Sequence, residues 1–475
     1  MQQQPKKSDG ETTTKDSWIR KLFERIYTEK FRLNILQALP FWIGSLLTGL
    51  VAVGYAKLFA VCETFSGTMF HARPWLLFLV TPLCFMAGWW IVKRFEPNAD
   101  GSGIPQVMAA IELASPKTNY LVDKLLSVKS IVVKIISTLL MATGGATIGR
   151  EGPTIQIAAS IFRKVNQLLP DSWPKVSKKN MIMTGAAAGL AAAFNTPLGG
   201  IVFAVEELAK THISYFKTAL FTAVIIAGIT AQSIMGSYLY LGYPTVGSSN
   251  WTMIFFVLIV ALLCGILGTF MCKVILKVIH MKSRLTSFKG QFLFVLTAAV
   301  LVAVIAYFIN GDILGSGKSD ISRLLFSGNK HADISLPFIR MIGSVTAFTS
   351  GGAGGVFAPA LGIGALVGGI VAEICSFSAS NANILILCGM VAFLTGITRT
   401  PFTSAILVLE MTDRHGLIFY LMTAGLIAGL VSNLMDRHSL YDQLTRMYLH
   451  RVLKTEDLPV AAVAAEEPAD FNNQS

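Results

Sequence analysis

Several apolar windows, each close to the length that crosses a lipid bilayer, constrain this chain more than any other feature. A transmembrane helix needs about 20 apolar residues to span the hydrocarbon core. The chain is 53% hydrophobic and only 14% charged, whereas soluble domains carry about 25% charged residues. The sequence therefore predicts an all-α, polytopic membrane protein. The clearest windows are residues 41–61, 75–92, 218–235, 251–272, 291–309 and 416–434.

The net charge of +12 is carried by basic residues that flank the apolar windows. Such residues favour cytoplasmic loops and anionic lipid headgroups, so we expect a lipid bilayer and no nucleic acid as partner. Residues 237–250 contain no Lys or Arg, which predicts an external loop, whereas the basic segments 210–217 and 273–289 predict cytoplasmic ones. Residues 1–30 carry no recognisable secretory signal. We expect a multi-pass protein of the inner (plasma) membrane with both termini in the cytoplasm.

The six cysteines lie mostly inside or beside apolar segments and form no C-x-x-C pair. This pattern favours buried thiols over a metal site or a disulfide framework. We expect no cofactor.

The segment 149–153, Gly-Arg-Glu-Gly-Pro, lies between the apolar segments 131–148 and 154–162. Ionisable residues at that depth are costly to insert, so they indicate a functional site. The glycines allow the backbone to break, and Pro153 suits the first turn of a new helix. The segment predicts a helix that begins inside the bilayer with Glu151 at its N-terminus. Such a terminus attracts anions, and the tethered Glu151 carboxylate can occupy the anion's own place.

A second break, Gly-Ser-Gly-Ile-Pro at residues 101–105, opens the apolar run 107–114, which is too short to span. Ser102 lies at the entrance of this predicted helix. Its hydroxyl can donate to an anion or, alternatively, act as an ordinary helix cap. Lys134 lies in an apolar setting, where it either adds positive potential to an anion site or snorkels to the interface.

Residues 198–208 predict an apolar helix of about 11 residues, roughly 16 Å long. Because that length does not cross the membrane, its acidic pair, Glu206 and Glu207, is expected inside the protein or at a water-filled entrance. The alternative is that both acids mark the membrane interface. The small residues of segment 181–195 predict a helix that packs closely against its neighbours.

The second part of the chain repeats this scheme. Gly-Ser-Gly at 315–317 and the glycine-rich segment 351–359, which ends in proline, are further interruptions. Interrupted segments at matching places predict an inverted repeat with a binding site near the membrane midplane. The predicted organisation is an N-terminal tail with an interfacial or solvated lead-in helix at 1–37, membrane half-repeats at 38–236 and 251–434, a C-terminal helix at 435–454 and a disordered tail at 455–475.

The segments 101–105, 149–153 and 354–359 resemble, in sequence and in order, the three anion-pathway signatures of the CLC family of chloride channels and chloride/proton antiporters. Tyr441 follows them, as the family's pathway tyrosine does, although such tyrosines are more often aromatic-belt residues. The resemblance extends over about residues 39–451. It implies a homodimer in which each subunit is built from two inverted halves and has its own anion path.

By this resemblance, the hydroxyls of Ser102 and Tyr441 and the backbone N–H groups of Val356 and Phe357 bind the central chloride. Glu151 resembles the gating glutamate. Serine at position 102, where other members have proline, implies a preference for chloride over nitrate. The supporting residues of the expected site are Gly149, Arg150, Gly152, Pro153 and Lys134.

Glu207 resembles the glutamate on the internal proton route, which channels of the family generally lack. The sequence therefore predicts a transporter and not an enzyme: a chloride/proton antiporter in which Glu151 carries the proton and gates the anion. One alternative is an uncoupled chloride channel of the same family, whose reversal potential would ignore a proton gradient. Another is a membrane-embedded enzyme that uses Glu151 and Glu207 as an acid/base pair, but no metal cluster, nucleophile motif or phosphate-binding loop supports it.

Overall fold

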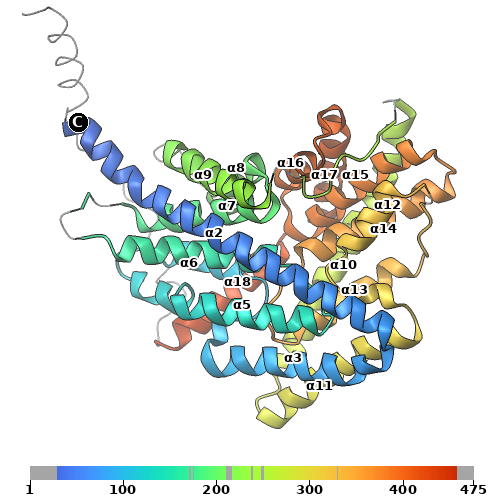
Figure 1. Ribbon diagram of the computed structural model, residues 1–475, viewed down its shortest axis with the longest axis horizontal. Helices are drawn as coiled ribbons and strands as arrows, with labels where there is room; N and C mark the ends of the chain where they lie inside the picture. Colours follow the sequence, from blue (N-terminus) through green and yellow to red (C-terminus); the bar gives the residue numbers. More distant parts are fainter. Residues whose placement is uncertain are drawn as a thin grey trace, which may run out of the picture.

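The computed structural model describes residues 29–170, 173–174, 176–209, 217–236, 239–247, 251–328 and 330–456, with side chains from residue 35 onward. Helices account for most of these residues (Figure 1). The predicted tails, most of the lead-in helix and the basic segment 210–217 fall largely outside the described residues.

The helices follow one another without any intervening sheet in the described part of the chain. Their bounds are α2 Glu29–Ala72, η1 Pro74–Leu76, α3 Leu77–Phe95, η2 Pro97–Ala99, α4 Ile104–Glu112, η3 Asn119–Lys124, α5 Val128–Thr143, α6 Glu151–Gln167, α7 Lys178–Phe194, α8 Pro197–Phe203, η4 Ala204–Ala209, α9 Lys217–Met235, α10 Trp251–Ser283, α11 Phe288–Phe308, η5 Gly311–Ile313, α12 Lys318–Phe326, α13 Leu336–Thr349, α14 Phe357–Ile374, α15 Ala379–Thr398, α16 Pro401–Thr412, η6 His415–Leu417, α17 Ile418–Met435 and α18 Leu440–Lys454.

Within the described residues, 9 helices are long and apolar enough to cross a membrane, and the windows named from the sequence fall inside them, except that 291–309 extends one residue past Phe308. This confirms the predicted all-α, polytopic membrane architecture. The remaining candidate spans are Asn119–Thr143, Phe357–Ile374 and Ala379–Thr398. The last two are 83% and 94% buried inside the protein over their most apolar stretch. Their apolar side chains therefore face other helices and not lipid.

The sequence underestimates the first span. The window 41–61 is only the middle of α2, a continuous helix of 44 residues that contains Pro40. At about 1.5 Å per residue, α2 is roughly 66 Å long, twice the hydrocarbon thickness of about 30 Å. It crosses the molecule diagonally (Figure 1). A helix of this length must tilt within the hydrocarbon or extend beyond it.

The interior helices pack at backbone contact distance through small residues. A Cβ atom added at Gly364 on α14 would lie 2.2 Å from the carbonyl oxygen of Gly389 on α15. On α7, a Cβ added at Gly189 would lie 2.6 Å from the Ala158 Cβ on α6. Close approach of this kind is how helices associate where lipid removes the hydrophobic driving force. It confirms the close packing predicted for residues 181–195.

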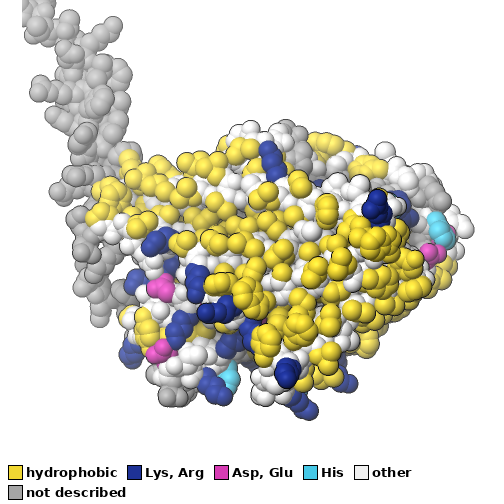
Figure 2. Space-filling view, turned by 60° about the horizontal axis from the view of Figure 1, so that its bottom comes forward, with side chains coloured by type: hydrophobic (Ala, Val, Ile, Leu, Met, Phe, Trp, Pro, Cys, Tyr) yellow, Lys and Arg dark blue, Asp and Glu magenta, His cyan; other side chains and the backbone are white. Residues whose placement is uncertain are grey.

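Apolar side chains cover most of the face shown in Figure 2, and Lys and Arg side chains gather along its lower part. This distribution fits a body in lipid with a basic rim at one interface. Exposed apolar side chains occur along the long helices, for example Leu46, Leu50 and Leu58 on α2, Leu83 on α3, Phe255 and Leu262 on α10, Leu293 on α11 and Leu430 on α17.

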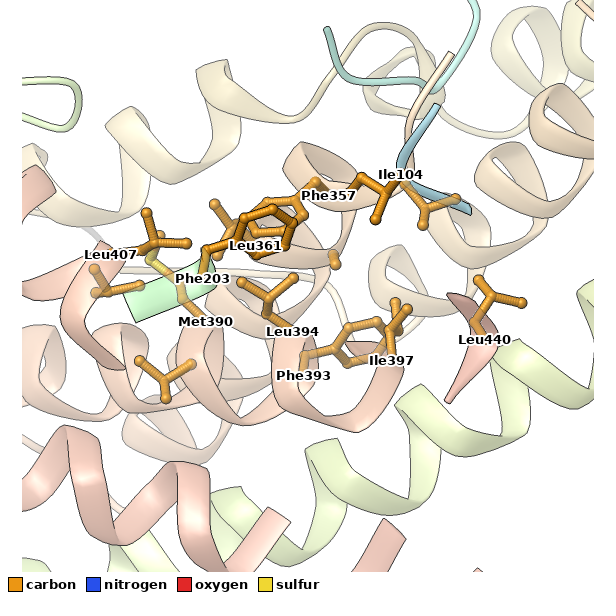
Figure 3. Close-up of a cluster of buried hydrophobic side chains, with 14 of the residues drawn as sticks. Ile104, Phe203, Phe357, Leu361, Met390, Phe393, Leu394, Ile397, Leu407 and Leu440 are labelled. Atoms are coloured by element: carbon orange, nitrogen blue, oxygen red, sulfur yellow. The ribbon is translucent and has the colours of Figure 1, made fainter. Parts of the chain in front are cut away.

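The main hydrophobic core lies where short and broken helices meet. Figure 3 shows Ile104, Phe203, Phe357, Leu407 and Leu440, which come from α4, α8, α14, α16 and α18, around α15. Several of these helices begin at the interrupted segments identified in the sequence. The core therefore fixes the N-termini around which the site is built.

Candidate anion site

Three interrupted segments are joined directly by backbone hydrogen bonds. The Gly101 N–H donates to the Gly352 oxygen at 3.0 Å, and the Gly354 N–H donates to the Gly101 oxygen at 3.0 Å. Gly149 and Gly355 exchange two further bonds, of 2.7 and 2.8 Å. Segments more than 200 residues apart in the chain thus form one unit. They bring the starts of α4, α6 and α14 together.

The start of α14 presents backbone donors. No described group accepts a hydrogen bond from the N–H of Val356 or of Phe357. Both residues are buried, with exposures of 0% and 1%. Unpaired N–H groups at a helix start carry positive partial charge and suit an anion.

Ser102 is 1% exposed, and its hydroxyl has no hydrogen-bond partner among the described residues. It does not cap α4: the N-cap residue is Gly103, with φ 110° and no side-chain capping bond. The interpretation of Ser102 as an ordinary helix cap is therefore wrong. A Cβ added at Gly152 would lie 2.2 Å from the Ser102 Oγ, so only glycine allows Ser102 to rest against the start of α6.

Tyr441 supplies a second buried hydroxyl from the first turn of α18. It is 0% exposed, which rules out the aromatic-belt interpretation. The Ser439–Asp442 capping box fixes the start of this helix. The Tyr441 hydroxyl is a neighbour of Ser102 but does not hydrogen-bond to it or to any other described group. Other buried hydroxyls of the described residues also lack partners, but these two lie together at one site.

Glu151 is the first residue of α6 and is 1% exposed. Its Oε1 accepts a hydrogen bond of 3.3 Å from the Tyr240 hydroxyl. Its Oε2 has no described partner. A Cβ built on Gly149 would lie 2.2 Å from this Oε2 and 3.1 Å from the Ala358 nitrogen. The carboxylate therefore folds back toward the start of α14, among the donors described above.

Two buried cations lie behind the interrupted segments. The Lys134 Nζ is 0% exposed and donates to the Asp100 and Gly101 oxygens at 3.2 and 3.1 Å, so the snorkelling interpretation is wrong. Arg340 on α13 likewise donates to the Gly315 oxygen at 3.1 Å and pairs with Asp320. Each cation donates a hydrogen bond to the carbonyl oxygen of the first glycine in a Gly-Ser-Gly sequence. The remaining expected residues, Arg150 and Pro153, are buried in the cap and first turn of α6.

The predicted helix 198–208 is wrong in its second part. α8 ends at Phe203 and continues as the π-helical turn η4, Ala204–Ala209. This turn buries Glu207, which is 6% exposed, and directs Glu206 elsewhere. The Glu206 carboxylate accepts hydrogen bonds from the N–H groups of Phe402 and Thr403 at 3.1 and 2.6 Å. The two acids of the pair therefore differ: Glu207 is buried, and Glu206 caps α16.

A matching cap at the start of α8 comes from a residue that was not predicted from the sequence. Glu410 on α16 accepts hydrogen bonds from the N–H groups of Leu198 and Gly199, at 3.0 and 2.7 Å, at the start of α8. The signal was present in the sequence: Thr196-Pro197 precedes Glu206 by the same interval as Thr400-Pro401 precedes Glu410.

A cavity of about 290 Å³ leads to Ser102 from the surface. Its charged lining consists of Lys93, Lys282, Arg451 and Asp100. Burial opposes ionisation of Asp100, but Arg451 and the Tyr448 hydroxyl hold the pKa of its carboxyl below the usual range. Three cations against one carboxylate make the approach to Ser102 attractive to anions.

Known proteins resemble this chain over most of its length. The family model described as "Voltage gated chloride channel" matches residues 83–433. The H(+)/Cl(-) exchange transporter ClcA of Citrobacter koseri is 29% identical over 473 residues, which cover 96% of this chain and 95% of the relative. ClcA of Yersinia pestis biovar Antiqua is 30% identical over 409 residues, which cover 84% and 82%.

Solved structures share the fold. A slow cyanobacterial Cl-/H+ antiporter superposes with a TM-score of 0.76 at 22% identity, covering 88% of this chain and 98% of that one. A CLC-type fluoride/proton antiporter superposes with a TM-score of 0.72 at 20% identity, covering 87% and 98%.

Proposed function

The chain belongs to the voltage gated chloride channel family, as its resemblance to CLC proteins predicts, and from this membership we propose that it exchanges chloride for protons across a membrane. The observation that carries the proposal is the buried Glu151 carboxylate beside buried donors that have no described partner. The relatives named above, which are H(+)/Cl(-) exchange transporters, support it.

Chloride, the substrate, binds in this proposal to the hydroxyls of Ser102 and Tyr441 and to the N–H groups of Val356 and Phe357. These donors are dipoles and not full positive charges. Binding therefore replaces part of the hydration shell yet stays weak enough for release. The Lys134 ammonium adds positive potential, but the Asp100 and Gly101 carbonyls keep it from contacting the anion.

Glu151 competes with chloride for the donors of α14. The ionised carboxylate occupies them as a substitute anion. When Glu151 takes up a proton, its charge and its affinity for these donors are lost. The side chain then leaves the donors, and chloride takes its place. One side chain therefore carries the proton and opens the anion path.

Glu207 relays protons between Glu151 and the cytoplasm. Its burial in the π-helical turn η4 supports this role, because a titratable group in a protein interior is costly and π turns occur frequently at functional sites. A channel has no use for such a group, so Glu207 favours exchange over uncoupled conduction.

We further propose a homodimer of inverted half-repeats in the inner membrane, with both termini cytoplasmic. The short helices α8 and α16 support dimerisation. They are too short to span a bilayer, yet Leu198, Val205 and Phe402 on and beside them are about half exposed. A second copy would cover these side chains.

Purified protein in liposomes tests the function. With a chloride gradient imposed, the external pH should change in step with chloride movement. Glu151→Gln should retain chloride flux and lose proton movement, because a neutral amide carries no proton. Glu207→Gln should lose proton movement at least tenfold while chloride passes, and Glu206→Gln, beside it in the sequence, is the matched control. Chloride exchange by the unmodified protein at constant external pH would show an uncoupled channel and refute the proposal.

A further inference from the structure

Tyr240 touches the Glu151 carboxylate although no family signature includes it. Its side chain is 7% exposed, and its hydroxyl donates to the Glu151 Oε1 at 3.3 Å. The ring packs edge-on against Phe194, with centroids 5.0 Å apart, and Phe194 in turn contacts Phe357 at 5.5 Å. Tyr240 therefore contacts Glu151 directly and is linked through Phe194 to Phe357, the first residue of α14.

The segment that carries Tyr240, residues 239–247, is anchored to the interior helices. The Leu241 N–H donates to the Met411 oxygen at 3.1 Å. The Asn383 side chain donates to the Thr245 oxygen at 2.8 Å. These hydrogen bonds hold the segment against α15 and α16, so the Tyr240 hydroxyl is preorganised.

Lys318 lies over the Tyr240 ring. It is the first residue of α12, and its Nζ lies 4.3 Å from the centroid of the Tyr240 ring. A cation over an aromatic face is attracted by the electron density of the ring. Lys318 also interacts electrostatically with Glu151, Arg150 and Glu63. The Glu63 Oε1 is itself held by the Ser316 N–H at 2.7 Å.

The charged and titratable groups around Glu151 come from several elements. Arg150 precedes it, and Lys318 faces it from α12; both favour its ionised form. Glu63 on α2 opposes ionisation. The phenols are Tyr55 on α2, Tyr240 beside the carboxylate and Tyr441 on α18. Among them, Tyr240 is the one whose hydroxyl bonds the carboxylate.

We infer that Tyr240, supported by Lys318, is a positioning residue that holds the ionised Glu151 carboxylate in its seated position and thereby sets the pH at which the gate opens. The inference rests on the proposed exchange function. A hydroxyl donates to a carboxylate more strongly than to a neutral acid. The bond therefore opposes protonation of Glu151, and without it the gate opens at a lower proton concentration.

The test is the pH profile of proton-coupled chloride exchange in liposomes, with equal pH inside and outside. Tyr240→Phe keeps the ring and removes the donor. Its midpoint should move up by about one pH unit, the effect expected for loss of one hydrogen bond to a charged group. Tyr243→Phe, in the same segment but 61% exposed, is the matched control and should leave the profile unchanged.

Two further variants exclude a merely structural effect. Lys318→Gln should move the midpoint in the same direction, because it removes positive potential from another element. In a Glu151→Gln background, which should retain chloride flux, Tyr240→Phe should leave the pH dependence of that flux unchanged. Residue 151 no longer titrates there.

If the unmodified protein shows coupled exchange but Tyr240→Phe has the same midpoint, this inference alone is overturned. A shift that persists in the Glu151→Gln background would also overturn it. Absence of coupled exchange in the unmodified protein would overturn the proposed function, and the inference with it.

Discussion

Gly152 is under a steric constraint that no other residue type can meet. A Cβ at this position would lie 2.2 Å from the Ser102 Oγ and 2.9 Å from the Ser102 carbonyl oxygen. Both contacts are far shorter than van der Waals distance, so a larger residue must push Ser102 away. The glycine that follows the gate therefore also positions a donor in a different segment.

Gly152→Ala should weaken chloride binding by roughly tenfold or more, because the displaced Ser102 hydroxyl no longer donates to the anion and a hydrogen bond to a charged group contributes about 1.5–3 kcal/mol. Calorimetric titration of the detergent-solubilised protein with chloride measures the change. Gly54→Ala on α2, where an added Cβ meets nothing within 4 Å, is the control. Equal affinity of the two variants would contradict the role of Gly152.

The residues that could be predicted are those whose local sequence is distinctive. Glu151 and Ser102 lie in glycine-proline segments, because a helix start inside a bilayer needs a backbone break and a first-turn proline. Tyr240 carries no such pattern. Its contact depends on how residues 239–247 fold back into the protein, which hydrophobicity does not reveal.

At the scale of helices, α16 and the continuous segment formed by α8 and η4 cap each other. Glu206 satisfies N–H groups at the start of α16, and Glu410 satisfies those at the start of α8. Each helix thus supplies the acceptor that the other needs, and each carboxylate faces a positive helix end. Glu207, next to Glu206, is held in place by this exchange. The hydrophobic pattern could not predict the π turn, because the 6 residues of η4 are too few to distinguish the α and π periods.

Glu410→Ala should lower the free energy of unfolding by about 1–2 kcal/mol, because two helical N–H groups lose their acceptor. The thermal midpoint in detergent should fall by a few degrees, and Glu410→Gln, which keeps an acceptor oxygen, should recover part of the loss. Asp333→Ala, at an exposed surface pair with His331, should have little effect. A Glu410→Ala midpoint equal to that of the unmodified protein would show that the caps do not stabilise the fold.

At the scale of the whole molecule, the apolar surface divides into a lipid-facing part and a part over α8 and α16. Long helices with exposed apolar side chains, such as α3 and α11, can span the lipid. The two short helices cannot, since their ends would leave polar backbone in hydrocarbon. The all-α membrane class was predictable, because long apolar windows of this kind are accommodated as membrane-spanning helices. The order in which helices pack was not, because close contacts such as Gly364–Gly389 join surfaces that the hydrophobic pattern does not distinguish.

Leu198→Lys should convert the proposed dimer into monomers, because two like charges would meet at a desolvated contact. Light scattering coupled to size-exclusion chromatography should show about half the protein mass. Leu46→Lys on α2, with an exposure of 49% against 54% for Leu198, controls for the charge itself. All the proposed chloride donors belong to one chain, so the monomer should still exchange chloride. An unchanged mass would place the contact elsewhere.

The hydrogen bonds that join residues 101 and 149 to residues 352–355 also impose an order on biosynthesis. A ribosome that has completed α9 has already delivered both functional glutamates to the bilayer, yet the nascent chain has no partner for either glycine segment. The proposed halide pocket can form only after α14 has been inserted, and it gains its last proposed donor, the Tyr441 hydroxyl, with α18. Until then part of the proposed coordination shell is missing.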